Sequence, residues 1–163
     1  MKQTKFILAG AVAALTLSSC SNNLDDNSSW DSDSQNVKFS SYIEGQKTVK
    51  ASGTTWTTGD KVGIFMKKAG ADLGAATAAN KQFIADDRGN LTAAAADQAL
   101  VYPEGAVDFV AYYPYTASVT ENKVAVDVKD QTKPADIDLL YSNNATNVTA
   151  SANAVNLGFK HQL

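Results

Sequence analysis

Cys20, the only cysteine in this 163-residue chain, is the residue to which the sequence assigns the most definite chemistry. Two lysines near the N-terminus are followed by an apolar run over residues 6–17, which is the layout of a signal peptide. The run is shorter than the roughly 20 apolar residues that span a membrane. The residues Leu17-Ser18-Ser19-Cys20 have the spacing of a bacterial lipobox. We predict that residues 1–19 are a lipoprotein signal peptide, cut by signal peptidase II between Ser19 and Cys20; the alternative is an ordinary secretory signal.

Lipidation at Cys20 would decide where the protein resides. In that pathway the thiol receives a diacylglyceryl group, and the new amino group is usually acylated as well. Each buried methylene contributes about 0.8 kcal/mol, so two or three acyl chains hold a protein firmly. Because the chain has no second cysteine, it forms no internal disulfide, and its stability has to come from packing.

The remaining residues that could do chemistry lack convincing partners. His161 is the only histidine and lies in an apolar alternation, so we interpret it as a packed or edge residue. With one histidine and one lipidated cysteine, no catalytic triad or zinc site is indicated. Asp86-Asp87 and the Asp136/Asp138 pair could serve glycoside hydrolysis, but their turn-rich surroundings favour solvated turn residues. We therefore expect no enzyme activity, no cofactor and no metal.

Three tyrosines form a candidate sugar-stacking surface, because aromatic faces suit sugar rings. Alternation along a strand places Tyr113 and Tyr115 on one face and Tyr112 on the other. Some of them must then belong to the core, and we favour core packing over sugar binding.

Composition limits the other possibilities. Removal of residues 1–19 leaves 163 − 19 = 144 residues, enough for one domain with a real core. Loss of Lys2 and Lys5 changes the formal charge from −3 to −5. This mild acidity argues against a nucleic-acid partner, which requires a basic face.

Residues 20–36 are predicted to be a polar tether, since they are rich in Ser, Asn and Asp and cannot bury enough surface to fold alone. Asp25 and Asp26 lie close behind the lipidated cysteine. They resemble the surface-export signal of some Gram-negative gut anaerobes, and a solubilising linker is the equal alternative.

From Val37 onward the pattern is that of short strands separated by turns. Val37, Phe39, Ser41 and Ile43 alternate with polar neighbours, which predicts a half-buried strand. Residues 67–80 are expected to be a loop, and Pro114 is expected to end a strand or place it at an edge. The other strands are expected at residues 47–51, 61–66, 81–85, 91–95, 107–115, 123–128, 138–141 and 152–163. This series predicts an all-β Greek-key sandwich over residues 37–163. The last strand pattern runs into Leu163, so we expect a domain incomplete at its C-terminus.

Four segments, in order, resemble segments of fimbrillin-like proteins. They are WTTGDKVGIFM at residues 56–66, FVAYYPY at 109–115, DLLYS at 138–142 and LGFKHQL at 157–163. Behind a lipobox, the four are specific together. The resemblance covers most of the mature chain but only the N-terminal domain of that family, and it implies a transthyretin-like β-sandwich.

The resemblance also implies a structural function. Fimbrillin-like proteins are lipoprotein precursors of type V pili, exported to the outer membrane. An arginine-specific protease removes the N-terminal strand, and a terminal strand from another subunit fills the groove that is opened. Other fimbrial subunits, the outer-membrane lipid around acylated Cys20 and surface ligands of a host or bacterium would then be the partners.

In this chain the removable strand corresponds to Val37, Phe39, Ser41 and Ile43. The maturation cut corresponds to Lys50, where relatives commonly have arginine; Arg88 is the only arginine here. This departure leaves two alternatives open: a lysine-tolerant protease acts at Lys50, or the protein stays unprocessed as an anchor or accessory. A monomeric, surface-exposed glycan-binding lipoprotein is the hypothesis from a different functional class.

Overall fold

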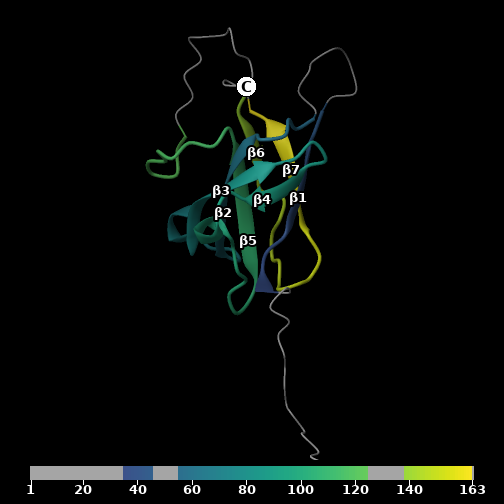
Figure 1. Ribbon diagram of the computed structural model, residues 1–163. Helices are drawn as coiled ribbons and strands as arrows, with labels where there is room; N and C mark the ends of the chain where they lie inside the picture. Colours follow the sequence, from purple (N-terminus) through teal and green to yellow (C-terminus); the bar gives the residue numbers. More distant parts are fainter. Residues whose placement is uncertain (1–34, 46–54, 125–137, 163) are drawn as a thin grey trace, which may run out of the picture.

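The structure, a computed structural model, describes residues 35–45, 55–124 and 138–162 (Figure 1). Within these ranges the chain forms strands and two short 3-10 turns, η1 (Leu73–Ala75) and η2 (Ala96–Gln98). The strands are β1 (Phe39–Ile43), β2 (Lys61–Lys68), β3 (Ala78–Ala85), β4 (Asn90–Ala93), β5 (Val107–Tyr113), β6 (Leu140–Ser142) and β7 (Val155–His161). The predicted all-β class is confirmed.

The strands form one sheet that closes into a barrel in the order β1-β4-β3-β2-β5-β6-β7. The expected Greek-key, transthyretin-like sandwich is not confirmed, because hydrogen bonds run around the whole ring instead of leaving two separate sheets. Every pair is antiparallel except β1 and β7, which are parallel. Figure 1 shows β1, in dark blue, beside the yellow β7. The closing strand is therefore the first in the chain, and it makes the one parallel contact of the described sheet.

The predicted strands agree with most of the observed elements. The strand predicted at 61–66 is β2, and Pro114 follows the end of β5. The turn between β3 and β4 contains Gly89 with φ +82°, a left-handed conformation that suits glycine. The loop expected at 67–80 was wrong at both ends, because β2 continues to Lys68 and β3 already begins at Ala78. The strand predicted at 47–51 lies outside the described residues. So does most of the strand predicted at 123–128, of which Lys123 forms only an isolated bridge with Thr120.

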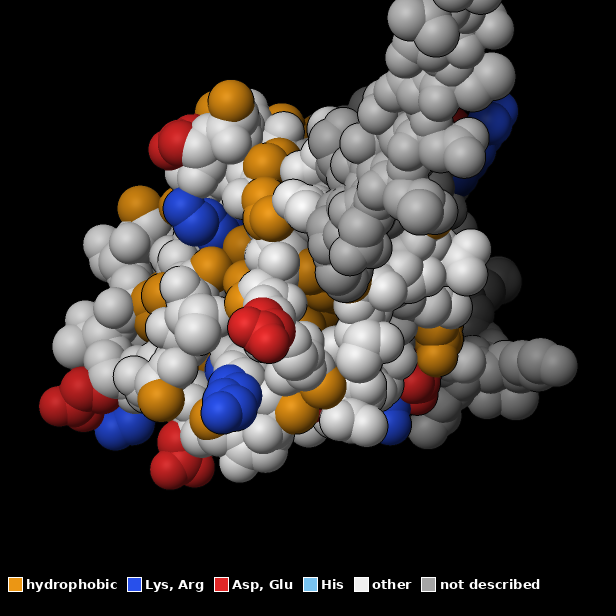
Figure 2. All heavy atoms as spheres, turned by 90° about the horizontal axis from the view of Figure 1, so that it is seen from below, with side chains coloured by type: hydrophobic (Ala, Val, Ile, Leu, Met, Phe, Trp, Pro, Cys, Tyr) orange, Lys and Arg blue, Asp and Glu red, His pale blue; other side chains and the backbone are white. Residues whose placement is uncertain are grey.

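The core fills the barrel and is dominated by aromatic and β-branched side chains. Phe39 packs edge-to-face against Phe83 and Phe109, with ring centroids 5.2 and 5.1 Å apart. Trp56 packs in the same way on Phe159 at 5.1 Å, near the opposite end of β1. Seen from below, charged side chains of both signs are spread over the face, with apolar side chains between them (Figure 2).

Candidate functional site

β1 is the candidate functional element because it is the first strand in the chain and closes the ring that the later strands form, by pairing with both β4 and β7. Its register with β7 runs from Phe39 opposite Val155 to Ile43 opposite Phe159. Its pairing with β4 is shorter and involves only Phe39 and Ser40. Beyond this short pairing, the Ser41 amide donates to the carbonyl of Gly89 in the turn before β4, at 2.7 Å.

The inward side chains of β1, and that of Val37 two residues before it, are part of the barrel core. Val37 and Phe39 are 7% and 3% exposed, Ser41 is 8% exposed, and Ile43 is half-buried against the same cluster. Burial of an apolar side chain of this size contributes about 1.5–3 kcal/mol. The alternation predicted from the sequence is thus confirmed, with Lys38, Tyr42 and Glu44 exposed on the outer face.

Backbone hydrogen bonds anchor β1 at both ends. The Val37 amide donates to the carbonyl of Leu100 at 2.9 Å, and the Glu44 amide donates to the carbonyl of Phe159 at 2.7 Å. Just before the strand, Asn36 forms an isolated bridge with Val101. Removing β1 would leave the facing edges of β4 and β7 unpaired and would uncover the core row, a combination that favours addition of another strand.

The predicted processing residues cannot be placed. Ser19, Cys20 and Lys50 lie outside the described residues, so their roles remain predictions. Of the predicted site residues, Val37, Phe39, Ser41 and Ile43 are described, and the structure brings them into one inward-facing row.

The opposite wall of the barrel, made of β2 and β5, is buried on both faces. Its inner face belongs to the core, and its outer face carries a second cluster of Phe65, Val110 and Tyr112. Lys67 on β2 also donates to Asp108 on β5 across 2.6 Å, with side chains 14% and 9% exposed. The bond from Lys67, followed by bonds from the amides of Asn147 and Gly70, lowers the pKa of Asp108 to about 2.

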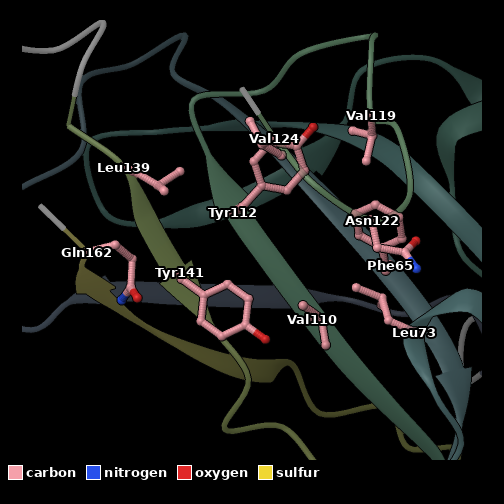
Figure 3. Close-up of a pocket in the computed structure, with 10 residues that line it drawn as sticks. All are labelled: Phe65, Leu73, Val110, Tyr112, Val119, Asn122, Val124, Leu139, Tyr141 and Gln162. Carbon is pink, nitrogen blue, oxygen red and sulfur yellow. The ribbon is translucent and has the colours of Figure 1, made fainter. Parts of the chain in front are cut away.

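The second cluster borders a pocket of about 270 Å³ on the outside of the barrel (Figure 3). In Figure 3, Tyr112 and Val110 project from β5 and Tyr141 from β6, while Asn122 and Gln162 add amide groups at its sides. The pocket is mostly apolar with a few polar groups, the usual character of a small-molecule site.

The predicted tyrosine surface is divided by the barrel wall. Tyr112 faces the outer cluster and is 5% exposed, whereas Tyr113 packs on the ring of Trp56 with centroids 5.6 Å apart. The predicted split between Tyr112 and Tyr113 is confirmed, and Tyr115 is half-buried. Tyr113 and Tyr115 therefore do not present a free platform for sugar rings.

The other candidate groups have structural partners. The Asp86 carboxylate accepts bonds from the amides of Arg88 and Asn90 and from the side chain of Asn90. The bond from the Asn90 side chain is the chief reason that the pKa of Asp86 is lowered. His161, at the end of β7, lies 2.7 Å from Asp138. Asp86 is therefore a turn residue, as predicted. His161 is exposed instead of packed, and it pairs with Asp138, which was expected to be a solvated turn residue. Asp136 lies outside the described residues.

Neither a metal-binding cluster nor a membrane-spanning helix occurs in the described ranges. Nowhere in them do three or more His, Cys, Asp or Glu side chains gather in a way that could hold a metal ion. No helix in the same ranges has the length and apolar character needed to cross a membrane.

Sequence reasoning missed two glycine contacts that fix the position of β1 between β4 and β7, a position that we call the seat of β1. Gly89 has no room for a side chain, since a Cβ would lie 2.1 Å from the carbonyl oxygen of Ser41. A Cβ on Gly158 would lie 2.7 Å from the hydroxyl of Tyr42. A glycine inside an apolar strand is the signal that could have found the second contact.

Comparison with known proteins agrees with the architecture. A model of the fimbrillin-like family matches residues 49–163, a range that holds every described strand except β1. The curated "Putative fimbrium subunit Fim1C" of Bacteroides uniformis is 33% identical over 117 residues, covering 70% of this chain and 38% of that protein.

Solved structures give the same picture. The crystal structure of a "putative cell adhesion protein" from Bacteroides uniformis matches with TM-score 0.59 and 30% identity, covering 78% of this chain and 48% of the other. A second structure with that description, from Bacteroides ovatus, shares the fold with TM-score 0.53 and 22% identity, covering 78% of this chain and 52% of the other. The chain thus spans roughly 38–52% of the length of these proteins. By its family match over residues 49–163, the chain belongs to the fimbrillin-like family.

Proposed function

We propose that this chain is a structural subunit or accessory protein of a bacterial surface fimbrium, with no enzymatic role. It would be exported as a lipoprotein and anchored in the outer membrane through Cys20. The observation that carries the proposal is the seat of β1, a single strand that closes the barrel and covers a row of core residues. The family match and the name of the relative from Bacteroides uniformis support the fimbrial setting.

Assembly would proceed by strand replacement. A cut at Lys50 would separate the β1 segment from the rest of the chain. Loss of β1 would open the ring between β4 and β7 and expose the core around Phe83 and Phe109. A strand from another fimbrial subunit would enter this groove, because it would pair both open edges and cover the exposed apolar surface.

A role in adhesion is part of the proposal. Two solved relatives are described as cell adhesion proteins, and a lipid-anchored or fimbrial position would place this chain where it can meet surfaces of a host or of other bacteria.

The test is to map the N-terminus of the protein recovered from the cell surface by mass spectrometry, together with the mass of its assemblies. Strand replacement predicts an N-terminus at Ala51 and high-mass assemblies. The double variant Lys47→Gln/Lys50→Gln is the matched control and should retain lipidated Cys20 and stay monomeric. Wild-type protein that carries only lipidated Cys20 and forms no assemblies would overturn the polymerising role, and Cys20→Ser should release the protein from the membrane.

A glycan-binding lipoprotein is the second candidate, and the outer pocket is the observation that favours it. The pocket combines the aromatic side chains of Phe65, Tyr112 and Tyr141 with the amides of Asn122 and Gln162, groups that suit a sugar ring. Tyr141→Ala should abolish polysaccharide binding by the monomer if this function holds, with Tyr42→Ala, on the outer face of β1, as the matched control. Absence of binding by the wild-type chain would remove the candidate.

A further inference from the structure

The seat of β1 makes different demands at successive positions, and these demands describe the strand that can replace it. At position 39 the ring of Phe39 stands between those of Phe83 and Phe109, nearly perpendicular to each at 86° and 87°. Such edge-to-face contacts require an aromatic ring and a well-defined depth of insertion. A smaller side chain would leave a cavity between the two rings.

Position 41 demands a small hydroxyl residue. The amide and the hydroxyl of Ser41 both donate to the carbonyl oxygen of Gly89, at 2.7 and 2.8 Å. The strand passes so close to this turn that Gly89 has no space for a Cβ. Because Ser41 is also buried, a large side chain here would have to push the strand away from the turn.

Position 42 marks the register on the outer face. Tyr42 lies directly opposite Gly158 of β7, and its ring covers the place where a Cβ would project. A shift of the strand by one residue would move this tyrosine into the core and Phe39 into solvent.

The same pattern occurs a second time in the chain, in β5. Val37-Lys38-Phe39-Ser40-Ser41-Tyr42 and Val107-Asp108-Phe109-Val110-Ala111-Tyr112 share Val, Phe, a small residue and Tyr at equivalent places. Tyr112 also lies opposite a glycine of its neighbour, Gly63 of β2, and its ring occupies the space of a Cβ there. The two strands thus share the spacing of valine, phenylalanine and tyrosine, whereas the hydroxyl at position 41 is particular to β1, since β5 has Ala111 there.

We infer that the groove left by β1 selects an incoming strand parallel to β7 that carries an aromatic residue, then a small hydroxyl residue two positions later, followed at once by tyrosine or another aromatic residue. This inference rests on the strand replacement proposed above and names its partner by chemistry: a terminal strand with the pattern apolar-x-aromatic-x-Ser/Thr-aromatic-apolar. Residues 37–43 of this chain satisfy the pattern and supply the parent peptide for its test.

The experiment uses the full chain with a site for a sequence-specific protease inserted between Lys50 and Ala51. After cleavage, fluorescent peptides of residues 36–45 compete with the severed segment, and insertion is followed by anisotropy and native mass spectrometry. We expect Phe39→Ala to weaken insertion by about 100-fold or more. Ser41→Phe should not insert measurably, Tyr42→Ala should insert about 3–10-fold more weakly, and the control Ser40→Ala should stay within about 2-fold of the parent peptide.

The outcomes separate the two claims. If the parent peptide inserts but Phe39→Ala and Ser41→Phe insert equally well, this inference is overturned and strand replacement stands. If the parent peptide fails to insert, strand replacement itself fails, and this inference with it. If the cleaved chain loses its fold, hydrogen exchange in the uncleaved chain provides the test. The amides of Ser41 and Glu44 should exchange at least about 10-fold faster in Phe39→Ala than in Ser40→Ala. Equal exchange rates would contradict the selection at position 39.

Discussion

The strand pairs β2/β5 and β1/β7 solve the same packing problem with different firmness. In each pair a tyrosine ring covers a glycine on the neighbouring strand, Tyr112 over Gly63 and Tyr42 over Gly158. Tyr112 is 5% exposed, and its hydroxyl bonds with Asn80 and with the backbone of Thr116. Tyr42 is 47% exposed.

Ion pairs repeat the contrast. Lys67 and Asp108 join β2 and β5 at 2.6 Å with both side chains shielded from solvent. Lys160 and Glu44 join β7 and β1 at 3.6 Å, with side chains 64% and 43% exposed. Exposed pairs of this kind contribute about 0–1 kcal/mol. The difference indicates that β5 is held firmly in the sheet, whereas the exposed contacts on the outer face of β1 set its register without holding the strand firmly.

The largest effect is expected in the wall formed by β2 and β5. Phe109→Ala should lower the free energy of unfolding of the whole chain by about 3–5 kcal/mol, because it removes a fully buried ring that contacts Phe39 and Tyr102. Denaturant unfolding followed by tryptophan fluorescence measures it. Phe39→Ala is the matched comparison and should leave residues 55–124 cooperatively folded. If Phe39→Ala and Phe109→Ala reduce the amide-exchange protection of β2 and β5 equally, the expected difference between the two strand pairs is contradicted.

Gly63→Ala should destabilise the chain by about 1–3 kcal/mol through overpacking. The new Cβ would lie 2.2 Å from a ring carbon of Tyr112 and 2.9 Å from the side-chain oxygen of Asn80. Thermal and denaturant unfolding provide the measurement. A stability equal to that of wild type would show that Tyr112 is not held as firmly as its hydrogen bonds indicate.

Acid should weaken the same wall. Since the pKa of Asp108 is lowered to about 2 from an ordinary 3.8, its contribution is present above about pH 4 and is lost as the pH falls through about 2. We expect Asp108→Asn to cost about 1–2 kcal/mol at pH 7 and to flatten the stability profile between pH 4 and 2. Unfolding curves across that range test this, and an Asp108→Asn profile as steep as that of wild type would contradict it.

The smallest effect on stability is expected at the contact between Tyr42 and Gly158. Gly158→Ala should change stability by less than about 1 kcal/mol, because the exposed ring of Tyr42 can swing away into solvent. Measured beside Gly63→Ala under the same conditions, it sharpens the comparison directly. Two equal losses would mean that β1 is locked as firmly as β5.

Much of this architecture could be predicted from local pattern. The alternation through Val37, Phe39, Ser41 and Ile43 identified β1, and Pro114 marked the end of β5. The start of β3 at Ala78 could not be predicted, since its alanine-rich beginning lacks β-branched residues and is held in the sheet by pairing with Met66.

The sequence by itself determined the class of the fold, the inward row of β1 and the family likeness, because each depends on the order and spacing of neighbouring residues. Only the tertiary structure decided that the sheet closes, that β1 closes it parallel to β7, and that Gly89 and Gly158 shape the seat. These features depend on contacts between residues far apart in the chain, such as Ser41 with Gly89 and Tyr42 with Gly158, whose distances no local pattern records.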